Sequence, residues 1–309
     1  MSGRYKRSPI VYMGNKFLLL DQLIPLFPLQ CDTFVDLFGG SGVVSMNYKG
    51  SKRNIYNELN ENVFDIVDMI KNTEPNILND KFESIINNYG LVKNGVKYNR
   101  DDVREQYKER ETAFYKLRED YNKSLNRSVE ELFLLMCYSI NNLIRFNGNG
   151  DFNAPSGDSC YNNTRFSKIK NMHNKFKNIE IYNKNAFAFD LSNLSENDFV
   201  YLDPPYSNTN AIYNEKRGGG WDIDSDYKLF NMLENLNKKG VRWGMSNVLA
   251  NRGITNKHLE DWCKKNNFNI NYLDITYTPF ASKTSEKPVE VYICNYKTQD
   301  NQISLFELL

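Results

Sequence analysis

Hydrophobic and polar positions along this chain alternate between two patterns, one typical of strands and one typical of helices. Short apolar runs that end at turn residues predict strands at 33–37, 54–57, 179–183, 199–202, 241–245, 270–277 and 289–296. Helical spacing of apolar residues predicts helices at 17–26, 43–48 and 226–238. Because strands and helices alternate, the sequence predicts a doubly wound α/β domain with a mixed sheet.

A long stretch between residues 62 and 167 interrupts this alternation. Its apolar spacing is helical and it carries many charges, and it ends in the loop-rich segment 147–157. Strand patterns return after it. The stretch is therefore predicted to be an insert within the sheet domain.

Composition excludes several classes of protein. With 309 residues and 40% hydrophobic content, the chain can form one large domain or a core domain with an insert. The five cysteines are scattered and form no C-x-x-C pair, so we expect reduced, mostly buried thiols. The two histidines, His173 and His258, lie in polar surroundings and are expected at the surface. A histidine triad or metal cluster therefore has little support, and we expect no metal.

Charge and hydropathy suggest an ordinary cytoplasmic protein. No apolar stretch approaches a membrane span, and the basic start is followed by no signal-peptide core, so no membrane contact is expected. The net charge of +1 does not indicate nucleic-acid binding, although Arg4, Lys6 and Arg7 cluster near the start.

The strongest chemical signal lies at residues 199–206. The apolar run 199–202 is typical of a buried strand, and two prolines must end it because proline lacks an N–H donor. Asp203 is then held at a strand tip, where open α/β sheets bind ligands. Its carboxylate and the Pro204 carbonyl could together accept a substrate amino group, and Tyr206 offers a face to a planar ring. A simple Pro-Pro turn explains the segment alone equally well.

A glycine-rich turn follows the first strand, with the sequence Asp-Leu-Phe-Gly-Gly-Ser-Gly at 36–42. Glycines let the backbone approach a ligand closely, and the following helix offers free N–H donors. The turn is not G-x-G-x-x-G, and a tight strand-to-helix turn is the alternative. Glu58 lies at the end of the second strand, where an acidic group can accept hydrogen bonds from ribose hydroxyls. Together the two features favour a nucleotide-like ligand.

Four further motifs, in order, resemble those of DNA adenine methyltransferases of the Dam family, in the D12 class and alpha group. In that class the recognition insert precedes a D-P-P-Y motif, here residues 203–206. The similarity covers nearly the whole length. The N-terminal cofactor motif, the glycine loop, the two parts of the DNA-reading hairpin and the last strand correspond to residues 8–16, 34–42, 143–147, 150–155 and 290–296.

The resemblance implies a Rossmann-like, S-adenosylmethionine-dependent methyltransferase fold with a mostly helical recognition insert and a β-hairpin. It implies a discontinuous catalytic domain at 1–61 and 168–309, and a DNA target-recognition insert at 62–167. The hairpin is expected at about 145–157, and 300–309 is a candidate clamp-binding tail.

The implied reaction is methyl transfer from S-adenosyl-L-methionine to the N6 amino group of adenine in a short duplex DNA site. The adenine must leave the duplex to react. Because its amino group is a poor nucleophile and the sulfonium already activates the methyl group, the enzyme must mainly position and polarise. The implied catalytic residues are Asp203, Pro204, Pro205 and Tyr206.

The resemblance also assigns cofactor contacts. Lys16 is expected near the cofactor carboxylate, the glycine loop along its methionine portion and Glu58 at its ribose. The family often has an acidic residue where this chain has Asn185. The full set is Tyr12, Lys16, Asp36, Phe38, Gly39, Gly40, Ser41, Gly42, Glu58, Asn185, Phe187 and Asp203.

For DNA, the resemblance favours Arg145 as a reader of guanine, because a guanidinium matches two acceptors on one base edge. A solvated or phosphate-binding arginine is the alternative. Val11 and Ser159 depart from family members that read GATC, so GATC or a related site remains open. The implied DNA-binding residues are Asn141, Arg145, Asn147, Asn153 and Pro155.

The C-terminal residues carry a separate hypothesis. Gln302, Leu305 and Phe306 resemble the short bacterial motif that docks into the replication sliding clamp, although packing of the tail on its own core is an equal alternative. A bacterial or phage-encoded protein associated with the nucleoid is expected, with a cognate restriction endonuclease as a functional partner in a restriction-modification system.

Two other functions compete with methyl transfer. One is a catalytically silent DNA-binding or clamp-tethered module of the same fold. The other is an NAD-dependent oxidoreductase, which shares the β-α-β opening. The intact Asp203 motif and Glu58 argue against the first, and the Pro-Pro strand tip has no purpose in the second.

Overall fold

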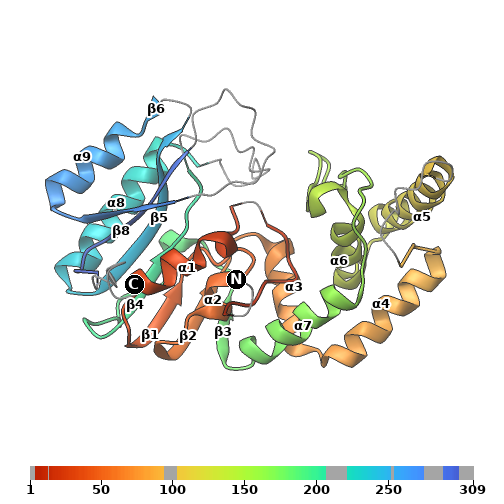
Figure 1. Cartoon of the computed structure of the whole chain (residues 1–309), viewed down its shortest axis with the longest axis horizontal. Coiled ribbons are helices and arrows are strands. Elements are labelled where there is room, and N and C mark those ends of the chain that lie inside the picture. Colours follow the sequence, from red (N-terminus) through yellow and green to blue (C-terminus); the bar gives the residue numbers. More distant parts are fainter. Residues whose placement is uncertain are drawn as a thin grey trace, which may run out of the picture. The chain divides into compact units, whose positions relative to one another are not determined.

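The computed structural model describes residues 4–12, 14–93, 103–206, 221–251, 254–274 and 288–298 (Figure 1). The chain divides into two compact units. We call the first the insert unit; it comprises Met1–Asn15, Gly40–Met46 and Asn60–Asn178. We call the second the sheet unit; it comprises Lys16–Gly39, Asn47–Leu59 and Ile179–Leu309.

One mixed sheet forms the centre of the sheet unit. Its strands are β1 (Cys31–Asp36), β2 (Ser51–Asn57), β3 (Ile179–Tyr182), β4 (Phe199–Leu202), β5 (Arg242–Asn251), β6 (Ile254–Thr255), β7 (Asn269–Leu273) and β8 (Val289–Cys294). The order is β3-β2-β1-β4-β5-β8-β7, with β6 paired to β5. The neighbouring strands β3, β2, β1, β4 and β5 are parallel to one another, whereas β8 runs antiparallel to both of its neighbours. The α/β class and the mixed sheet are confirmed.

The sheet is covered on both faces, which explains why β4 is apolar at every position. One face packs against α8 (Ile223–Lys238) and α9 (Lys257–Asn266), with Trp243 of β5 in this core. On the other face lies an aromatic cluster in which Phe27 contacts the rings of Phe199 and Tyr201 at 5.0 Å each. A strand buried on both faces cannot alternate polar and apolar residues.

The predicted helix at 17–26 is instead three short segments. These are η1 (Lys16–Leu19), α1 (Leu20–Leu23) and η2 (Ile24–Leu26). Pro25 has no N–H to donate to the preceding turn, so a regular helix cannot continue through it. Lys16 is the first residue of the first of these segments.

The insert unit is helical, as the sequence predicts. It contains α3 (Glu61–Asn72), α4 (Pro75–Tyr89), α5 (Val103–Lys123), α6 (Val129–Tyr138), η3 (Ile140–Asn142) and α7 (Asn163–Phe176), and α2 (Val43–Asn47) begins in it. All residues of α6 from Leu132 to Tyr138 are buried, so this apolar helix is surrounded by other chain segments. Asn60, Ser128 and Asn162 cap their helices through side-chain oxygens.

Two expectations about single residue types have different outcomes. All five cysteines are free and buried, as predicted. The expectation that His173 lies at the surface is wrong: it is 4% exposed, and its Nδ1 lies 3.0 Å from the Ile70 carbonyl. Polar sequence neighbours did not reveal this burial because His173 lies on the inward face of α7 with Ile169 and Phe176. Among the described residues, no helix combines the length and apolar character that a membrane span needs.

Candidate functional site

Asp203 follows β4, and two side chains hold its carboxylate. Lys16 Nζ lies 2.7 Å from both of its oxygens, and Tyr206 Oη donates to Oδ1 at 2.8 Å. The Lys16 side chain is 4% exposed, whereas the Asp203 side chain is 20% exposed. These contacts use three of the roughly four lone-pair positions of a carboxylate. Among the described residues, no further group contacts Oδ2, which leaves one position there for a ligand.

The surroundings of Tyr206 keep its hydroxyl protonated. Burial, followed by the neighbouring Asp203 charge, raises the pKa of Tyr206 well above its usual value. The hydroxyl is therefore a hydrogen-bond donor throughout the neutral range. Lys16 Nζ also lies 5.4 Å from the Tyr206 ring centroid, which is within the range of a cation–π contact.

The ends of β1 and β2 lie next to each other at the same edge of the sheet, because Asp36 pairs with Tyr56. The chain then turns at Gly39, whose N–H donates to the Asn57 carbonyl at 2.8 Å. A Cβ on Gly39 would lie 2.1 Å from Tyr56 Cε2, so only glycine fits this close approach. Glu58 follows β2 and is 6% exposed. The predicted residues Asp36, Phe38, Gly39 and Glu58 thus follow one sheet edge.

An aromatic group lies in the same unit. Phe187 of η4 (Ala186–Ala188) is 39% exposed and stacks on Trp221 with ring centroids 5.9 Å apart. Phe38 meets the same indole edge-on at 5.8 Å. The Asn185 side chain accepts from the Phe187 N–H at 2.9 Å, so it fixes the short helix that presents Phe187. Asn185 thereby has a structural task that needs no acidic side chain.

Trp221 is a candidate site residue that sequence reasoning missed. Its Nε1 donates to Asp226 Oδ1 at 2.7 Å, and His258 Nε2 lies 2.8 Å from Asp226 Oδ2. Asp226 is 4% exposed and belongs to α8. The indole is therefore held at its polar end while its rings contact Phe38 and Phe187. No periodic pattern marks a single tryptophan before a helix, so only the fold reveals this contact.

The remaining predicted cofactor residues lie in the insert unit. Gly40 has φ +50°, and a Cβ there would lie 3.3 Å from Tyr12 Cδ1. Gly42 has φ +71°, and a Cβ there would lie 2.7 Å from Phe176 Cζ. Ser41 Oγ accepts from Asn15 Nδ2 at 3.2 Å. The left-handed backbone and the close neighbours explain both glycines, and they bring Tyr12 over Gly40.

Arg145 and Asn153 pair across the hairpin of the insert unit. Arg145 Nε donates to Asn153 Oδ1 at 2.8 Å and Nη2 to the Asn153 carbonyl at 2.7 Å, while the Asn153 N–H donates back to the Arg145 carbonyl at 2.9 Å. The hairpin is held by two isolated antiparallel bridges, Ser139 with Ser156 and Phe146 with Phe152. The guanidinium is therefore fixed in orientation, and within the part of the chain that the structure describes its Nη1 stays available for a further acceptor.

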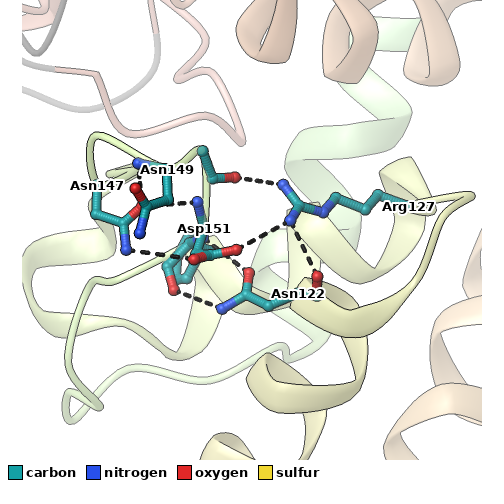
Figure 2. A network of polar contacts seen from close by, with 7 residues as sticks. Asn122, Arg127, Asn147, Asn149 and Asp151 are labelled. Carbon is teal, nitrogen blue, oxygen red and sulfur yellow. Dashed lines mark hydrogen bonds and ion pairs between the residues drawn. The ribbon is translucent and has the colours of Figure 1, made fainter.

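The tip of the hairpin is a tight polar turn (Figure 2). Asn147 Oδ1 accepts from the N–H groups of Asn149 and Asp151, each at 2.9 Å, as asparagine does in turns. The Pro155 carbonyl, farther along, accepts from the Ile140 N–H at 3.0 Å. The side-chain oxygen of Asn147 thus serves the turn. Asn149 is exposed beside it.

Two residues outside the hairpin hold this turn in place, as Figure 2 shows. The Asn122 side chain makes both hydrogen bonds with the Phe152 backbone, at 2.8 and 3.0 Å. Arg127 donates to the carbonyls of Asn122 and Gly150 and to the carboxylate of Asp151. Sequence reasoning missed both residues, because they are at least 23 positions from the hairpin residues that they contact and carry no motif.

The base of the hairpin contains two consecutive asparagines with positive φ, Asn141 at 52° and Asn142 at 54°. Such conformations are uncommon for residues other than glycine and require support from their surroundings. Asn142 is buried, and its amide lies near the Met136 and Cys137 carbonyls while its oxygen accepts from Arg165 at 3.1 Å. Asn141 is exposed. The candidate clamp residues Gln302, Leu305 and Phe306 lie outside the described residues.

A carboxylate at the tip of a central parallel strand, a glycine turn after β1 and an acidic residue after β2 are the features expected of a Rossmann-like methyltransferase. Residues 12–279 match the D12 class N6 adenine-specific DNA methyltransferase family, and the chain belongs to this family.

Three curated proteins are similar in sequence to this chain. The chain is 36% identical over 303 residues to the modification methylase StsI of Streptococcus sanguinis and 34% identical over 307 residues to the type II methyltransferase M.FokI of Planomicrobium okeanokoites. In each case the match covers 96% of this chain and 44% of the relative. It is 25% identical over 213 residues to the DNA adenine methylase of Escherichia coli K12, covering 67% of this chain and 68% of that protein. The chain therefore spans less than half of the first two relatives.

The residues present fit S-adenosylmethionine, the methyl donor that the family implies in general. The faces of Phe187 and Trp221 suit a purine ring, and the nearly buried Glu58 suits a ribose diol. In the glycine turn, a Cβ at Gly39 would clash with Tyr56 and one at Gly42 with Phe176, so the backbone carries no side chain at these two positions.

Proposed function

We propose that the chain transfers a methyl group from S-adenosylmethionine to the N6 amino group of adenine in a short duplex DNA site, GATC or a related sequence. The observation that carries this proposal is the Asp203 carboxylate, oriented by Lys16 and Tyr206 with a lone pair on Oδ2 still available. It lies directly before the Pro204 carbonyl at the end of β4. The Asp203 carboxylate and the Pro204 carbonyl are adjacent in the sequence, and each can accept one of the two hydrogens of a single amino group.

The chemistry of this pair follows from the weakness of the nucleophile. The adenine amino nitrogen shares its lone pair with the ring, and hydrogen bonds from both of its hydrogens to Asp203 and Pro204 localise electron density on it. The cofactor supplies a methyl group that its sulfonium makes electrophilic. After transfer the nitrogen sheds a proton, which Asp203 Oδ2 can accept. Holding the reactants in line accounts for much of the acceleration.

For Lys16 we propose a role that differs from the one suggested by resemblance. Its ammonium contacts the Asp203 carboxylate, which supports a proposal that Lys16 orients this carboxylate and stabilises its negative charge. The proposed contact with the cofactor carboxylate is the competing assignment. The two predict different kinetic defects, since loss of a cofactor contact raises KM and loss of carboxylate orientation lowers kcat.

The target adenine is proposed to flip out of the duplex and to stack on Tyr206, at an unpairing cost of about a few kcal/mol. The catalytic domain is proposed to comprise 1–61 and 168–309, and the insert at 62–167 to read DNA. Arg145 is the proposed guanine reader, because its fixed guanidinium retains Nη1 as a donor. Asn141, Asn147, Asn153 and Pro155 are proposed to support or contact the DNA beside it.

The proposal also covers the cellular setting. We place the protein in the cytoplasm of a bacterium or phage-infected cell, acting on the nucleoid and paired functionally with a restriction endonuclease. Binding of residues 300–309 to the sliding clamp is a separate proposal. Loss of clamp pull-down after deletion of these residues, with methylation retained, would support it, and no binding by the full chain would end it.

Incorporation of tritiated methyl groups into DNA tests the function, and single-molecule sequencing of DNA from cells that express the chain reveals the modified base and its context. Asp203→Ala is expected to abolish incorporation while cofactor binding, measured by calorimetry, persists. Cofactor binding without methylation by the wild-type chain would favour the silent DNA-binding module. Substantial turnover by Asp203→Ala would remove this carboxylate from the mechanism.

A further inference from the structure

Two segments of the insert unit concentrate positive charge. The N-terminal segment at residues 4–12 contains Arg4, Lys6 and Arg7 and no acidic residue. Helix α7 contains Arg165, Lys168, Lys170 and Lys175 and no acidic residue. The total charge of the chain is close to neutral, so this concentration is a local property and not a consequence of composition.

Arg165 ties the two segments together. Its Nη1 donates to the Pro9 carbonyl at 3.0 Å, and its Nη2 donates to Asn142 Oδ1 at 3.1 Å. Arg165 is 8% exposed, so this connection lies within the unit. Because Arg7 is two residues before Pro9, the connection also brings Arg7 to α7. The same guanidinium supports the positive-φ turn at the base of the hairpin.

Lys168 completes the cluster. It is one helical turn after Arg165 and thus on the same side of α7. Burial, and then repulsion by the charges of Arg165 and Arg7, lower the pKa of the Lys168 ammonium. Three cations held close together repel one another, and an anion that binds there reduces this repulsion.

We propose that Arg7 and Lys168 bind backbone phosphates of the duplex beside the hairpin; together with Arg165 they are here called the α7 basic surface. This inference rests on the proposed function for its choice of DNA as the anion. Arg7 is exposed and Lys168 half-buried, so both can reach a phosphate, while Arg165 contributes charge and holds the segments together. The contact is independent of base sequence, in contrast to the proposed role of Arg145.

The salt dependence of duplex binding tests this inference. Fluorescence anisotropy of the full chain with two labelled duplexes, one that it methylates and one unrelated, gives the slope of log affinity against log salt concentration. Lys168→Gln and Arg7→Gln are each expected to reduce that slope by about 0.9. Each should weaken both duplexes by the same factor, and Lys168→Arg should restore the wild-type slope.

Lys170→Gln is the matched control. Lys170 is exposed on the same helix, two positions after Lys168 and therefore on nearly the opposite side, and its ammonium lies 4.4 Å from the Phe166 ring centroid. This variant should keep the wild-type slope. Wild-type slopes for Lys168→Gln and Arg7→Gln, or no duplex binding by the wild-type chain at low salt, would overturn the inference. Duplex binding without methyl transfer would instead contradict the proposed function and leave the slopes to decide the inference.

Discussion

The strand tip at Asp203 and the hairpin at Arg145 use polar side chains in opposite ways. At the strand tip, a nearly buried ammonium and a tyrosine hydroxyl converge on one carboxylate and leave a single position for a ligand. At the hairpin, contacts from α5 and the following turn hold the backbone, and the tip residues stay exposed. The difference teaches that the proposed chemistry relies on desolvated, preorganised groups, whereas the proposed DNA contact relies on a supported but accessible loop.

The strongest way to break this comparison is Lys16→Met. Without the ammonium the Asp203 carboxylate loses its main partner, and we expect kcat to fall about 100-fold, equivalent to about 2.7 kcal/mol, while KM for the cofactor changes little. Steady-state kinetics with DNA and labelled cofactor measure both. Lys52→Met is the control, since the Lys52–Asp32 pair has the same 2.7 Å separation but lies at the surface, with Lys52 84% exposed. A raised KM with normal kcat would assign Lys16 to the cofactor carboxylate instead.

Gly39→Ala tests how rigid the sheet edge is. The added methyl group would meet the Tyr56 ring, so we expect a loss of about 1–3 kcal/mol in the free energy of unfolding. Urea denaturation followed by fluorescence measures this loss. Gly148→Ala at the hairpin serves as the comparison, because an added Cβ there meets nothing within 4 Å. Equal stability of the two variants would show that the edge yields easily.

Arg127→Met should sharpen the description of the hairpin. It removes three contacts that hold the turn but none at Asp203. We expect KM for DNA to rise about tenfold, equivalent to about 1.4 kcal/mol, with kcat and KM for the cofactor nearly unchanged. Lys123→Met is the control, because Lys123 is 70% exposed and pairs only with Glu119 in its own helix among the described residues. A fall in kcat alone would contradict a role in positioning DNA.

Tyr206→Phe should have the smallest effect. The ring that would stack on the adenine stays, and one hydrogen bond to Asp203 is lost, so we expect kcat to fall by less than about tenfold. Because the pKa of Tyr206 is well above its usual value, its hydroxyl stays protonated on both sides of neutrality. The pH dependence of kcat between pH 7 and pH 9 should therefore be the same for both proteins, to within about a factor of two. A loss of activity in this range that is present only in the wild type would indicate that the tyrosine ionises.

Local patterns were sufficient for several parts of the fold. The apolar run of β4 and the two prolines after it placed Asp203 at a strand tip without any knowledge of its neighbours. The helical insert was recognisable from apolar spacing alone. The same reasoning missed α9, whose few apolar residues are Leu259, Trp262 and Cys263, and it treated 17–26 as one helix although Pro25 divides it.

Other features depended on residues that lie far apart in the sequence. Lys16 and Asp203 are separated by 187 positions, and Arg165 and Pro9 by 156. His173 was expected in solvent but is buried, since the face of α7 that meets α3 is decided by packing. Trp221 gained its place beside Phe187 through Asp226 of α8.

By itself, the sequence indicated most of the strands, the helical insert and the turn after β4, because apolar spacing and the missing N–H of proline act over a few residues. The sequence also indicated the family, because its motifs follow one another in the same order as in that family. Only the tertiary structure decided which partner each polar group took: Lys16 on Asp203, Asn185 on the Phe187 backbone and Arg127 on the hairpin. The physical reason is that a buried polar group must be satisfied by whatever packing brings within hydrogen-bonding distance, and no local pattern encodes that choice.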